Sequence, residues 1–366
     1  MTSVAAAAEK IHLGMDTSIA TIVVGVLRPA SEVPVVEAIP HDAESVRRLV
    51  GKFPDRGALA ACYEAGPGGY ELHRLLASMG VACDVVAPSL IPRGAGDRVK
   101  TDRRDAVHLA LLHRAGLLTP VRVPSPEEEA VRDLVRTRAD LAGDRKRMMQ
   151  RINALLTRHG RAWKAARWTA DHRAWLERQS FAEPPLQAAL RTYLAALDAR
   201  EAELAVLERQ LRDCWAGIEW LAPAVRRLGC YRGIAELTGL TLAAEVTDFR
   251  RFGSARAFMG FTGLTPSEYS SGARTRRAGI TKAGPQLVRS ALAESAWAYR
   301  HRPAIGATLR HRQQDACPET LARSWKAQQR LHATYVKLTR RGKIPTVAVT
   351  AVARELAGFV WAEMTS

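Results

Sequence analysis

Hydrophobic and polar residues follow two different patterns along this chain. Near the N-terminus, short runs rich in valine and isoleucine are separated by turns and by short amphipathic segments. Such runs predict β-strands, and the amphipathic segments between them predict helices. The predicted strands span residues 11–16, 21–27, 33–39, 58–64 and 82–87, and the predicted helices span 43–53 and 70–79. Strands and helices that alternate at this spacing indicate an α/β domain with parallel strands on one side.

The middle of the chain, residues 121–221, has a helical period instead. Ser125-Pro-Glu-Glu128 is a capping box with proline in the first helical turn. Large apolar residues then recur every seven positions on both sides of a tryptophan-rich bend: Leu134, Leu141, Met148 and Leu155 before it, and Leu190, Leu197, Leu204 and Leu211 after it. This spacing predicts a coiled-coil hairpin or a dimer stalk, and an ordinary helical hairpin packed on its own domain fits it equally well.

Residues 222–366 are expected to form a separate, mostly helical domain. Helices are predicted at 285–300, 317–341 and 345–362, with a polar loop rich in glycine and serine at 265–285. The fold class is therefore α/β plus α: residues 1–120 with hairpin strands before βαβ units, as in a ribonuclease-H-like mixed sheet, then a helical linker, then a helical domain.

Several classes of protein are excluded by what the sequence lacks. It has no run of 18 or more apolar residues, so no membrane span is expected, and its first residues do not resemble a secretory signal. The five cysteines are scattered and form no C-x-x-C pair. They are interpreted as buried thiols of a protein in a reducing cytoplasm.

The charge is unevenly distributed. The chain has 54 Lys+Arg and 37 Asp+Glu, a net charge of +17. Residues 1–120 hold 13 basic and 13 acidic residues, whereas residues 221–366 hold 23 basic and 9 acidic residues. A uniform compositional bias toward arginine would not concentrate the excess at one end. The cationic last part of the chain predicts a phosphate-bearing partner.

Four acidic residues of the first domain form a candidate metal site. Asp16 and Glu64 each end a predicted strand, and Asp102 and Asp105 lie three positions apart at the start of a predicted helix. Residues three apart on a helix share a face, where two carboxylates would repel each other without a cation. Mg²⁺ prefers such oxygen ligands, and two metals could support in-line attack at phosphorus. An acidic first helical turn favoured by the helix dipole is the alternative for the aspartate pair.

A second candidate site lies in the polar loop. Ser270 and Ser271 precede Gly272 and stand among basic residues, which are Arg274, Arg276, Arg277, Lys282 and Arg289. Guanidinium groups around a hydroxyl could hold a phosphate for attack by serine. A plain surface turn fits the same residues, because serine and glycine are common in turns.

These segments, taken in order, resemble the insertion sequence 110 family of transposases. The segments are Gly14-Met-Asp16, Glu64-Ala-Gly-Pro-Gly-Gly-Tyr70, Lys100-Thr-Asp-Arg-Arg-Asp105 and Gly263-Leu-Thr-Pro-Ser-Glu-Tyr-Ser-Ser-Gly272. The resemblance implies an N-terminal RuvC-like domain whose four acids, Asp16, Glu64, Asp102 and Asp105, bind Mg²⁺ or Mn²⁺. It also implies a coiled coil and a C-terminal transposase domain in which Ser271 attacks a DNA phosphate.

The resemblance further implies the partners. They are target and donor DNA, a bridge RNA that pairs with both, and further copies of the chain in a dimer or tetramer. A bacterial cytoplasmic location at the nucleoid follows. Two alternatives stay open: a RuvC-like metal-dependent nuclease in which Ser271 is only a turn residue, and a non-catalytic nucleic-acid-binding protein left by a decayed transposase.

Overall fold

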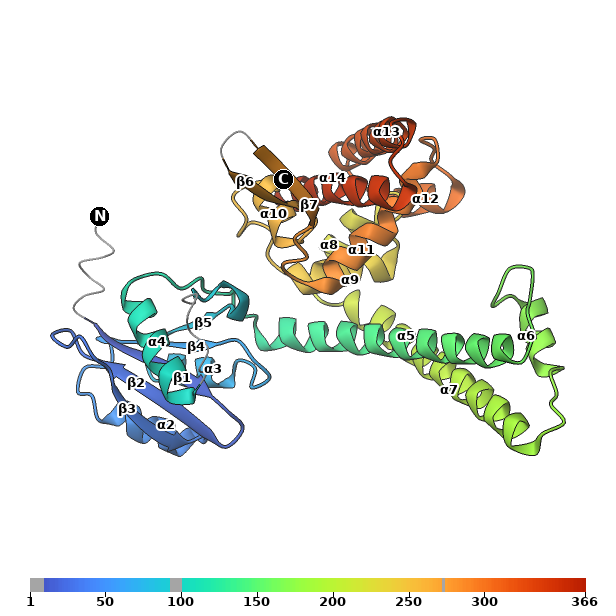
Figure 1. Ribbon diagram of the computed structural model, residues 1–366. Helices are drawn as coiled ribbons and strands as arrows, with labels where there is room; N and C mark the ends of the chain where they lie inside the picture. The colour runs from blue at the N-terminus through green and yellow to red at the C-terminus, as the bar shows by residue number, and fades with distance from the viewer. Residues whose placement is uncertain (1–9, 93–100, 272–273) are drawn as a thin grey trace. The chain divides into compact units, whose positions relative to one another are not determined.

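The computed structural model describes residues 10–92, 101–271 and 274–366, and between 269 and 277 it describes the backbone without the side chains. The chain forms two compact units that meet between Pro124 and Ser125. It is mixed α/β, mostly helical, with one five-stranded sheet and a small two-stranded one (Figure 1). The predicted three-part division at residues 1–120, 121–221 and 222–366 is finer than these two units and stays a prediction.

The first unit is built on the five-stranded sheet. Its strands are β1 (Ile11–Thr17), β2 (Thr21–Leu27), β3 (Val35–Pro40), β4 (Leu59–Glu64) and β5 (Ala82–Val86). They lie in the order β3-β2-β1-β4-β5, with β1 antiparallel to β2 and parallel to β4. The mixed sheet and all five of its strands are thus as the sequence predicts, since runs rich in valine and isoleucine favour strands.

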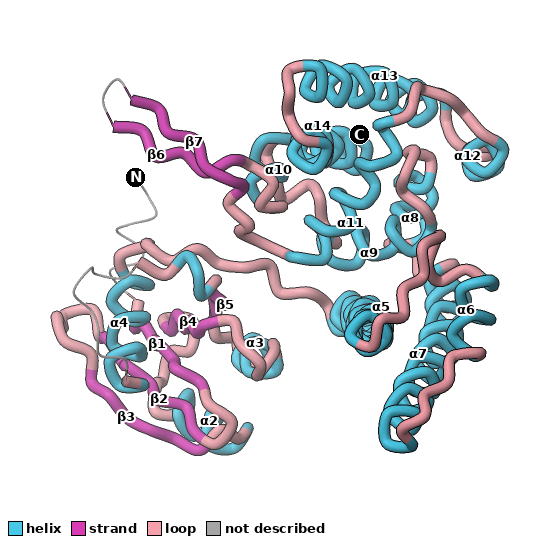
Figure 2. The backbone as a smooth tube through the Cα atoms, turned by 45° about the vertical axis from the view of Figure 1, so that its right-hand side comes forward, coloured by secondary structure: helices cyan, strands magenta, loops and turns pink. Residues whose placement is uncertain are grey.

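Helices cover both faces of this sheet. On one face, side chains of β1 and β2 share a buried cluster with Val46 of α2 (Ala43–Gly51) and Leu76 of α3 (Glu71–Ser78). On the other face, Cys62 of β4 packs against Leu109 of α4 (Asp102–Arg114). The sheet therefore lies between two helical layers, as Figure 2 shows for α4 and α2.

The second unit begins with a long helical hairpin. Its elements are α5 (Pro126–Arg158), α6 (Ala170–Glu177) and α7 (Pro184–Trp215), and α5 starts with the capping box predicted at Ser125. Helices α5 and α7 pack against each other within one chain. The four leucines of the second heptad run, from Leu190 to Leu211, are all buried. The structure thus contains the helical hairpin, and the coiled coil and dimer stalk stay predictions.

The remaining helices pack around the last one. They are α8 (Ala222–Gly229), α9 (Glu236–Val246), α10 (Ala255–Phe261), α11 (Gln286–Ala296), α12 (Ala307–Arg312), α13 (Pro318–Arg340) and α14 (Pro345–Thr365). Helix α14 contacts α8, α10, α11 and α13, and its Val352, Leu356 and Val360 are fully buried. Arg136 of α5 donates to both carboxylate oxygens of the buried Glu245 of α9, at 2.8 and 3.1 Å. This pair ties the hairpin to the helical core.

The cysteines correct one expectation. All five are free thiols, but only Cys62 and Cys230 are buried, Cys83 is half-buried, and Cys214 and Cys317 are exposed. The expectation of buried thiols is therefore wrong for these last two, which lie on helix surfaces and helix ends where a small side chain need not be covered. In the described part of the chain, no helix is long and apolar enough to cross a membrane.

Candidate functional site

Asp16 and Glu64 lie at equivalent positions on two neighbouring strands. Strands β1 and β4 are parallel, and the last residues that pair between them are Met15 and Tyr63. Asp16 and Glu64 are the next residues on each strand. Neighbouring strands in a sheet are about 4.8 Å apart, and aligned residues project to the same face. The two carboxylates are therefore adjacent at one edge of the sheet.

Both carboxylates project to the face covered by α4. Gly14 and Cys62 pair with each other two residues earlier on the two strands. A Cβ atom on Gly14 would lie only 2.3 Å from the backbone nitrogen of Ala110 in α4, and the Cys62 Sγ lies 3.6 Å from an α4 carbonyl oxygen. Side chains two residues apart on a strand share a face. Asp16 and Glu64 thus face α4 as well.

Helix α4 runs in the direction opposite to β1. Its C-terminal part contacts the start of the strand, where the Nδ1 atoms of His113 and His12 are 3.2 Å apart. Its middle, at Ala110, contacts Gly14 in the centre of the strand. The first turn of α4 therefore points toward the end of β1, and this turn carries Asp102 and Asp105. The N-terminus of α4 and the two strand-end acids lie at the same edge.

The four acids share this edge without forming a ligand cluster. Asp16, Glu64 and Asp105 are half-buried and Asp102 is exposed. The first turn of α4 is capped by the Thr101 hydroxyl, which accepts a hydrogen bond from the backbone N–H of Arg104 at 3.3 Å. Among the described residues, no three acidic, histidine or cysteine side chains are arranged to hold a metal ion. The donor set suits Mg²⁺ or Mn²⁺ in kind, because all four are carboxylates.

A cavity of about 800 Å³ lies beside the strand ends. It is lined by residues 17–20, which follow Asp16, by Pro67 and Gly68 in the turn after Glu64, and by His41. None of the four acids is among the lining residues, although the cavity adjoins the strand ends that carry Asp16 and Glu64. His41 was not predicted as a site residue, because it lies two positions after the predicted strand at 33–39 and belongs to none of the motifs.

The candidate serine lies on a β-hairpin, and the predicted loop at 265–285 is wrong in this respect. Strands β6 (Pro266–Ser271) and β7 (Arg274–Ile280) pair antiparallel, with Ser271 opposite Arg274 and Ser270 opposite Thr275. Backbone pairing forms this hairpin although its strands carry almost no apolar residues. Ser271 is the last residue of β6, and the side chains of Ser270 and Ser271 lie outside the described part of the structure.

Close backbone packing fixes the base of the hairpin. Gly263 and Gly284 have φ angles of +68° and +78°, and a Cβ on Gly284 would lie 1.9 Å from the carbonyl oxygen of Phe261. Only glycine adopts such angles readily and permits this approach. Arg289 of α11 donates from one Nη1 to the carbonyl oxygens of Thr262, Ala283 and Gly284, at 3.3 to 3.4 Å. The base is therefore held by α11.

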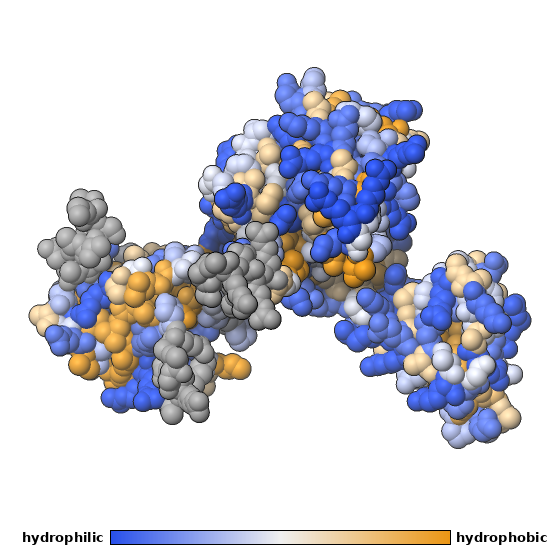
Figure 3. Space-filling view, turned by 45° about the horizontal axis from the view of Figure 1, so that its top comes forward, coloured by the Kyte–Doolittle hydropathy of each residue, from blue (hydrophilic) through white to orange (hydrophobic). Residues whose placement is uncertain are grey.

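The basic residues predicted around the serine occupy different places. Arg274, Arg276 and Arg277 are on β7, and their side chains lie outside the described part. Lys282 is exposed, with an unusual φ of +55°. The guanidinium of Arg289 is engaged at the base of the hairpin, which favours a structural role. Figure 3 shows predominantly hydrophilic residues over the viewed face of the C-terminal helices.

The partly and fully buried cysteines do not offer an alternative nucleophile. Burial raises the pKa of Cys83 to about 12 and that of Cys230 to about 11, and it raises the pKa of Cys62 well above the usual range. Because the thiolate is the reactive form, these three thiols are unreactive at neutral pH.

Two family models and several known proteins match this chain. A family model described as a transposase, the DEDD type of IS110, matches residues 13–160. A second, described as "Transposase IS116/IS110/IS902 family", matches residues 225–310. The transposase y4qE of Sinorhizobium fredii is 44% identical over 87% of this chain and 77% of its own length. The transposase for insertion sequence element IS1533 of Leptospira borgpetersenii is 32% identical over 91% of this chain and 98% of its own.

Proposed function

Because the chain belongs to the IS116/IS110/IS902 family of transposases, we propose that it cuts and rejoins DNA through a covalent bond between Ser271 and a DNA phosphate. Membership makes it a transposase of an insertion sequence, an enzyme whose substrate is DNA. The DEDD type of the N-terminal match suggests dependence on a divalent metal ion. The catalytic role of Ser271, the identity of the metal ion and the use of a bridge RNA belong to the proposal.

The observation that carries the proposal is the shared edge of Asp16, Glu64 and the first turn of α4. Two parallel strands and one antiparallel helix direct these acids toward the same edge of the sheet. We assign Asp16, Glu64, Asp102 and Asp105 as the residues that hold Mg²⁺ or Mn²⁺. When bound, such an ion supplies stabilisation of negative charge on phosphate oxygens. We propose that the DNA strand approaches the acids through the adjoining cavity, which is lined by residues that directly follow Asp16.

The serine step conserves the energy of the phosphodiester. The Ser271 hydroxyl oxygen forms a bond to phosphorus, its proton leaves to solvent or a nearby base, and the bond from phosphorus to the departing strand's oxygen breaks. The hydroxyl of the incoming strand then attacks the phosphoserine and releases the serine. The position of Ser271 at the end of β6, opposite Arg274, supports this assignment, since guanidinium groups bind phosphate in bidentate fashion.

A bridge RNA and an oligomer complete the proposal. Residues 221–366 carry 23 basic and 9 acidic residues, an excess sufficient for more than one nucleic-acid strand. Exchange between two duplexes requires several active sites, so we propose a dimer or tetramer in which α5 and α7 contribute contacts. The substrate DNA places this assembly at the bacterial nucleoid.

The serine assignment is tested by trapping the intermediate. Purified protein is mixed with DNA carrying the element's ends and then separated on a denaturing gel. Wild-type protein and the Ser270→Ala control form a denaturant-resistant protein–DNA adduct, and Ser271→Ala forms none. Adduct formation by Ser271→Ala at the wild-type level refutes the assignment.

The same gel separates the two alternatives. A RuvC-like nuclease yields DNA with free ends and no adduct, and both serine variants stay active. A decayed transposase that only binds nucleic acid yields neither adduct nor cleavage, although it retards DNA on a native gel.

A further inference from the structure

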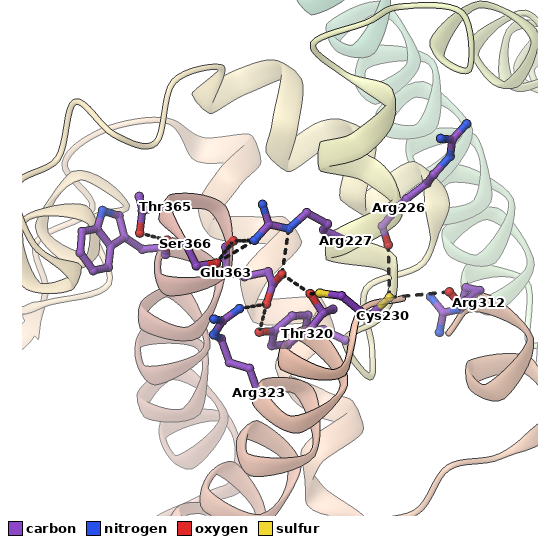
Figure 4. A network of polar contacts seen from close by, with 12 residues as sticks. Arg226, Arg227, Cys230, Arg312, Thr320, Arg323, Glu363, Thr365 and Ser366 are labelled. Atoms are coloured by element: carbon purple, nitrogen blue, oxygen red, sulfur yellow. Dashed lines mark hydrogen bonds and ion pairs between the residues drawn. The ribbon is translucent and has the colours of Figure 1, made fainter. Parts of the chain in front are cut away.

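A second polar site lies among α8, α12 and α13. These helices line a cavity of about 300 Å³ together with the segment that joins α12 to α13. Three arginines line it, which are Arg226, Arg227 and Arg312. Cys230, Asp315, Cys317 and Thr320 contribute to the same lining. Figure 4 shows the three arginines, Cys230 and Thr320 next to a network of polar contacts around Glu363.

One of the three arginines has a protein counter-charge. Arg227 Nε donates to the carboxylate of Glu363 at 2.9 Å, and Glu363 is fully buried. Arg323 also pairs with Glu363, and the Tyr231 hydroxyl donates to it at 3.0 Å. Glu363 is thus satisfied by four neighbours, with Thr320 as the last of them at 2.6 Å. This network fixes the wall of the cavity.

The other two arginines have no such partner. In the described part of the chain, no carboxylate lies within ion-pair distance of Arg226 or Arg312. Arg312 is half-buried and donates from one Nη1 to the carbonyl oxygen of Ile234, while its Nε is buried and has no hydrogen-bond partner. Burial lowers the pKa of Arg312. A guanidinium removed from water without an anion is costly, which favours binding of one.

The charges around the cavity favour an anion. Four arginines, 226, 227, 312 and 323, lie near three acids, which are Glu363, the exposed Asp315 and Glu319 in the first turn of α13. These side chains together keep a net charge of about +1 at neutral pH. The side chains of Arg226 and Arg312 lie on the far side of Cys230 from Glu363 (Figure 4). Their charges are directed away from the internal network.

We propose that this cavity binds a phosphate group of a DNA strand, with Arg312 and Arg226 as the phosphate ligands. The volume accommodates one phosphodiester and its flanking sugar atoms, and guanidinium groups are suited to phosphate oxygens. The site contributes affinity and position rather than sequence recognition. This proposal rests on the proposed action of the protein on DNA, and it does not depend on the role of Ser271.

Cys317 provides a built-in reporter for this site. It lines the cavity, is exposed, and lies 3.3 Å from the Thr320 hydroxyl, whereas the exposed Cys214 on α7 is a control thiol outside it. The full chain is treated with iodoacetamide, with and without a single-stranded DNA 20-mer, and alkylation of each cysteine is followed by mass spectrometry. At a DNA concentration about ten times the dissociation constant, alkylation of Cys317 slows about tenfold and that of Cys214 is unchanged.

Variants separate the phosphate site from other effects. Arg226→Gln and Arg312→Gln each remove the protection, and the exposed Arg226 serves as the variant that leaves the fold intact. Arg209→Gln on α7 changes the net charge equally and retains protection, as does Ser271→Ala. Retained protection in Ser271→Ala keeps this test independent of the serine chemistry.

Five results overturn the proposal. The first four are equal protection of Cys214, protection that survives both arginine variants, loss of protection in Arg209→Gln, and equal protection by potassium chloride at matched ionic strength. Protection by inorganic phosphate but not by DNA also overturns it, because the source is then a free anion.

Discussion

Substitution of Gly14 by alanine tests whether α4 positions the acids. Gly14 lies on β1 where α4 crosses it, and a Cβ there would be 2.3 Å from Ala110 N and 2.4 Å from Ala106 O. An ordinary contact begins at 3.4 Å, so α4 must move by about 1 Å from the strand. Both contacts are with backbone, and no side-chain rotation can relieve them.

The displacement of α4 is expected to lower both the free energy of unfolding and the rate of DNA cleavage, and the rate is expected to fall more strongly. Overpacking of this kind costs about 1–3 kcal/mol of the free energy of unfolding. A displacement of about 1 Å at a catalytic group costs on the order of 10²-fold in rate. Gly14→Ala is therefore expected to lower the urea midpoint and to reduce DNA cleavage about a hundredfold at a temperature where the protein remains folded.

A matched control and a second variant sharpen the test. Gly51→Ala, at the end of α2, meets nothing within 4 Å and is expected to keep both the midpoint and the rate. Gly25→Ala meets the Ala106 carbonyl oxygen at 2.7 Å, so its effect is expected to be smaller than that of Gly14→Ala. If Gly14→Ala keeps wild-type stability and cleavage, α4 does not hold the acids as argued.

Two further predictions concern the acids. Asp102→Asn removes one proposed metal ligand and is expected to abolish DNA cleavage. The urea midpoint is expected to stay unchanged, because Asp102 is exposed. EDTA should abolish cleavage by the wild-type protein and Mg²⁺ should restore it, so an unchanged rate in EDTA contradicts the metal role. Burial alone would raise the pKa of Glu363, but hydrogen bonds from Thr320, Arg323, Arg227 and Tyr231 lower it below 4.5. Its contribution to stability is thus present above pH 4.5 and is lost as the pH falls through the lowered value. Glu363→Gln should lower the free energy of unfolding by about 3–5 kcal/mol at pH 7 and should remove most of the loss of stability at acidic pH in urea titrations. Glu219→Gln, at an exposed position, should have neither effect.

The sheet could be predicted because its strands are specified locally. Residues such as Thr21–Leu27 favour extended backbone, and the strand is buried on both faces over its second half, so its continuous apolar run predicts the strand directly. The hairpin at Pro266–Ile280 could not be found in this way, because the sequence of its strands contains few apolar residues. Its pairing depends on the tight base at Gly263 and Gly284, which is a property of tertiary packing.

The candidate site was only partly accessible from sequence. Strand-end positions identified Asp16 and Glu64, but the direction of α4 follows from close packing on Gly14, which no local pattern reveals. The choice of Ser271 over Ser270 came from the family resemblance alone. The arginine cavity at α8 and α12 joins segments distant in sequence, so no local motif marks it.

We propose that Ser271 itself carries the DNA during strand exchange. The direct measurement is peptide mass spectrometry of the trapped protein–DNA adduct after digestion by protease and nuclease. We expect a nucleotide phosphate attached to Ser271 and to no other residue. A modified Ser270, another modified residue, or cleaved DNA without any modified peptide would contradict it.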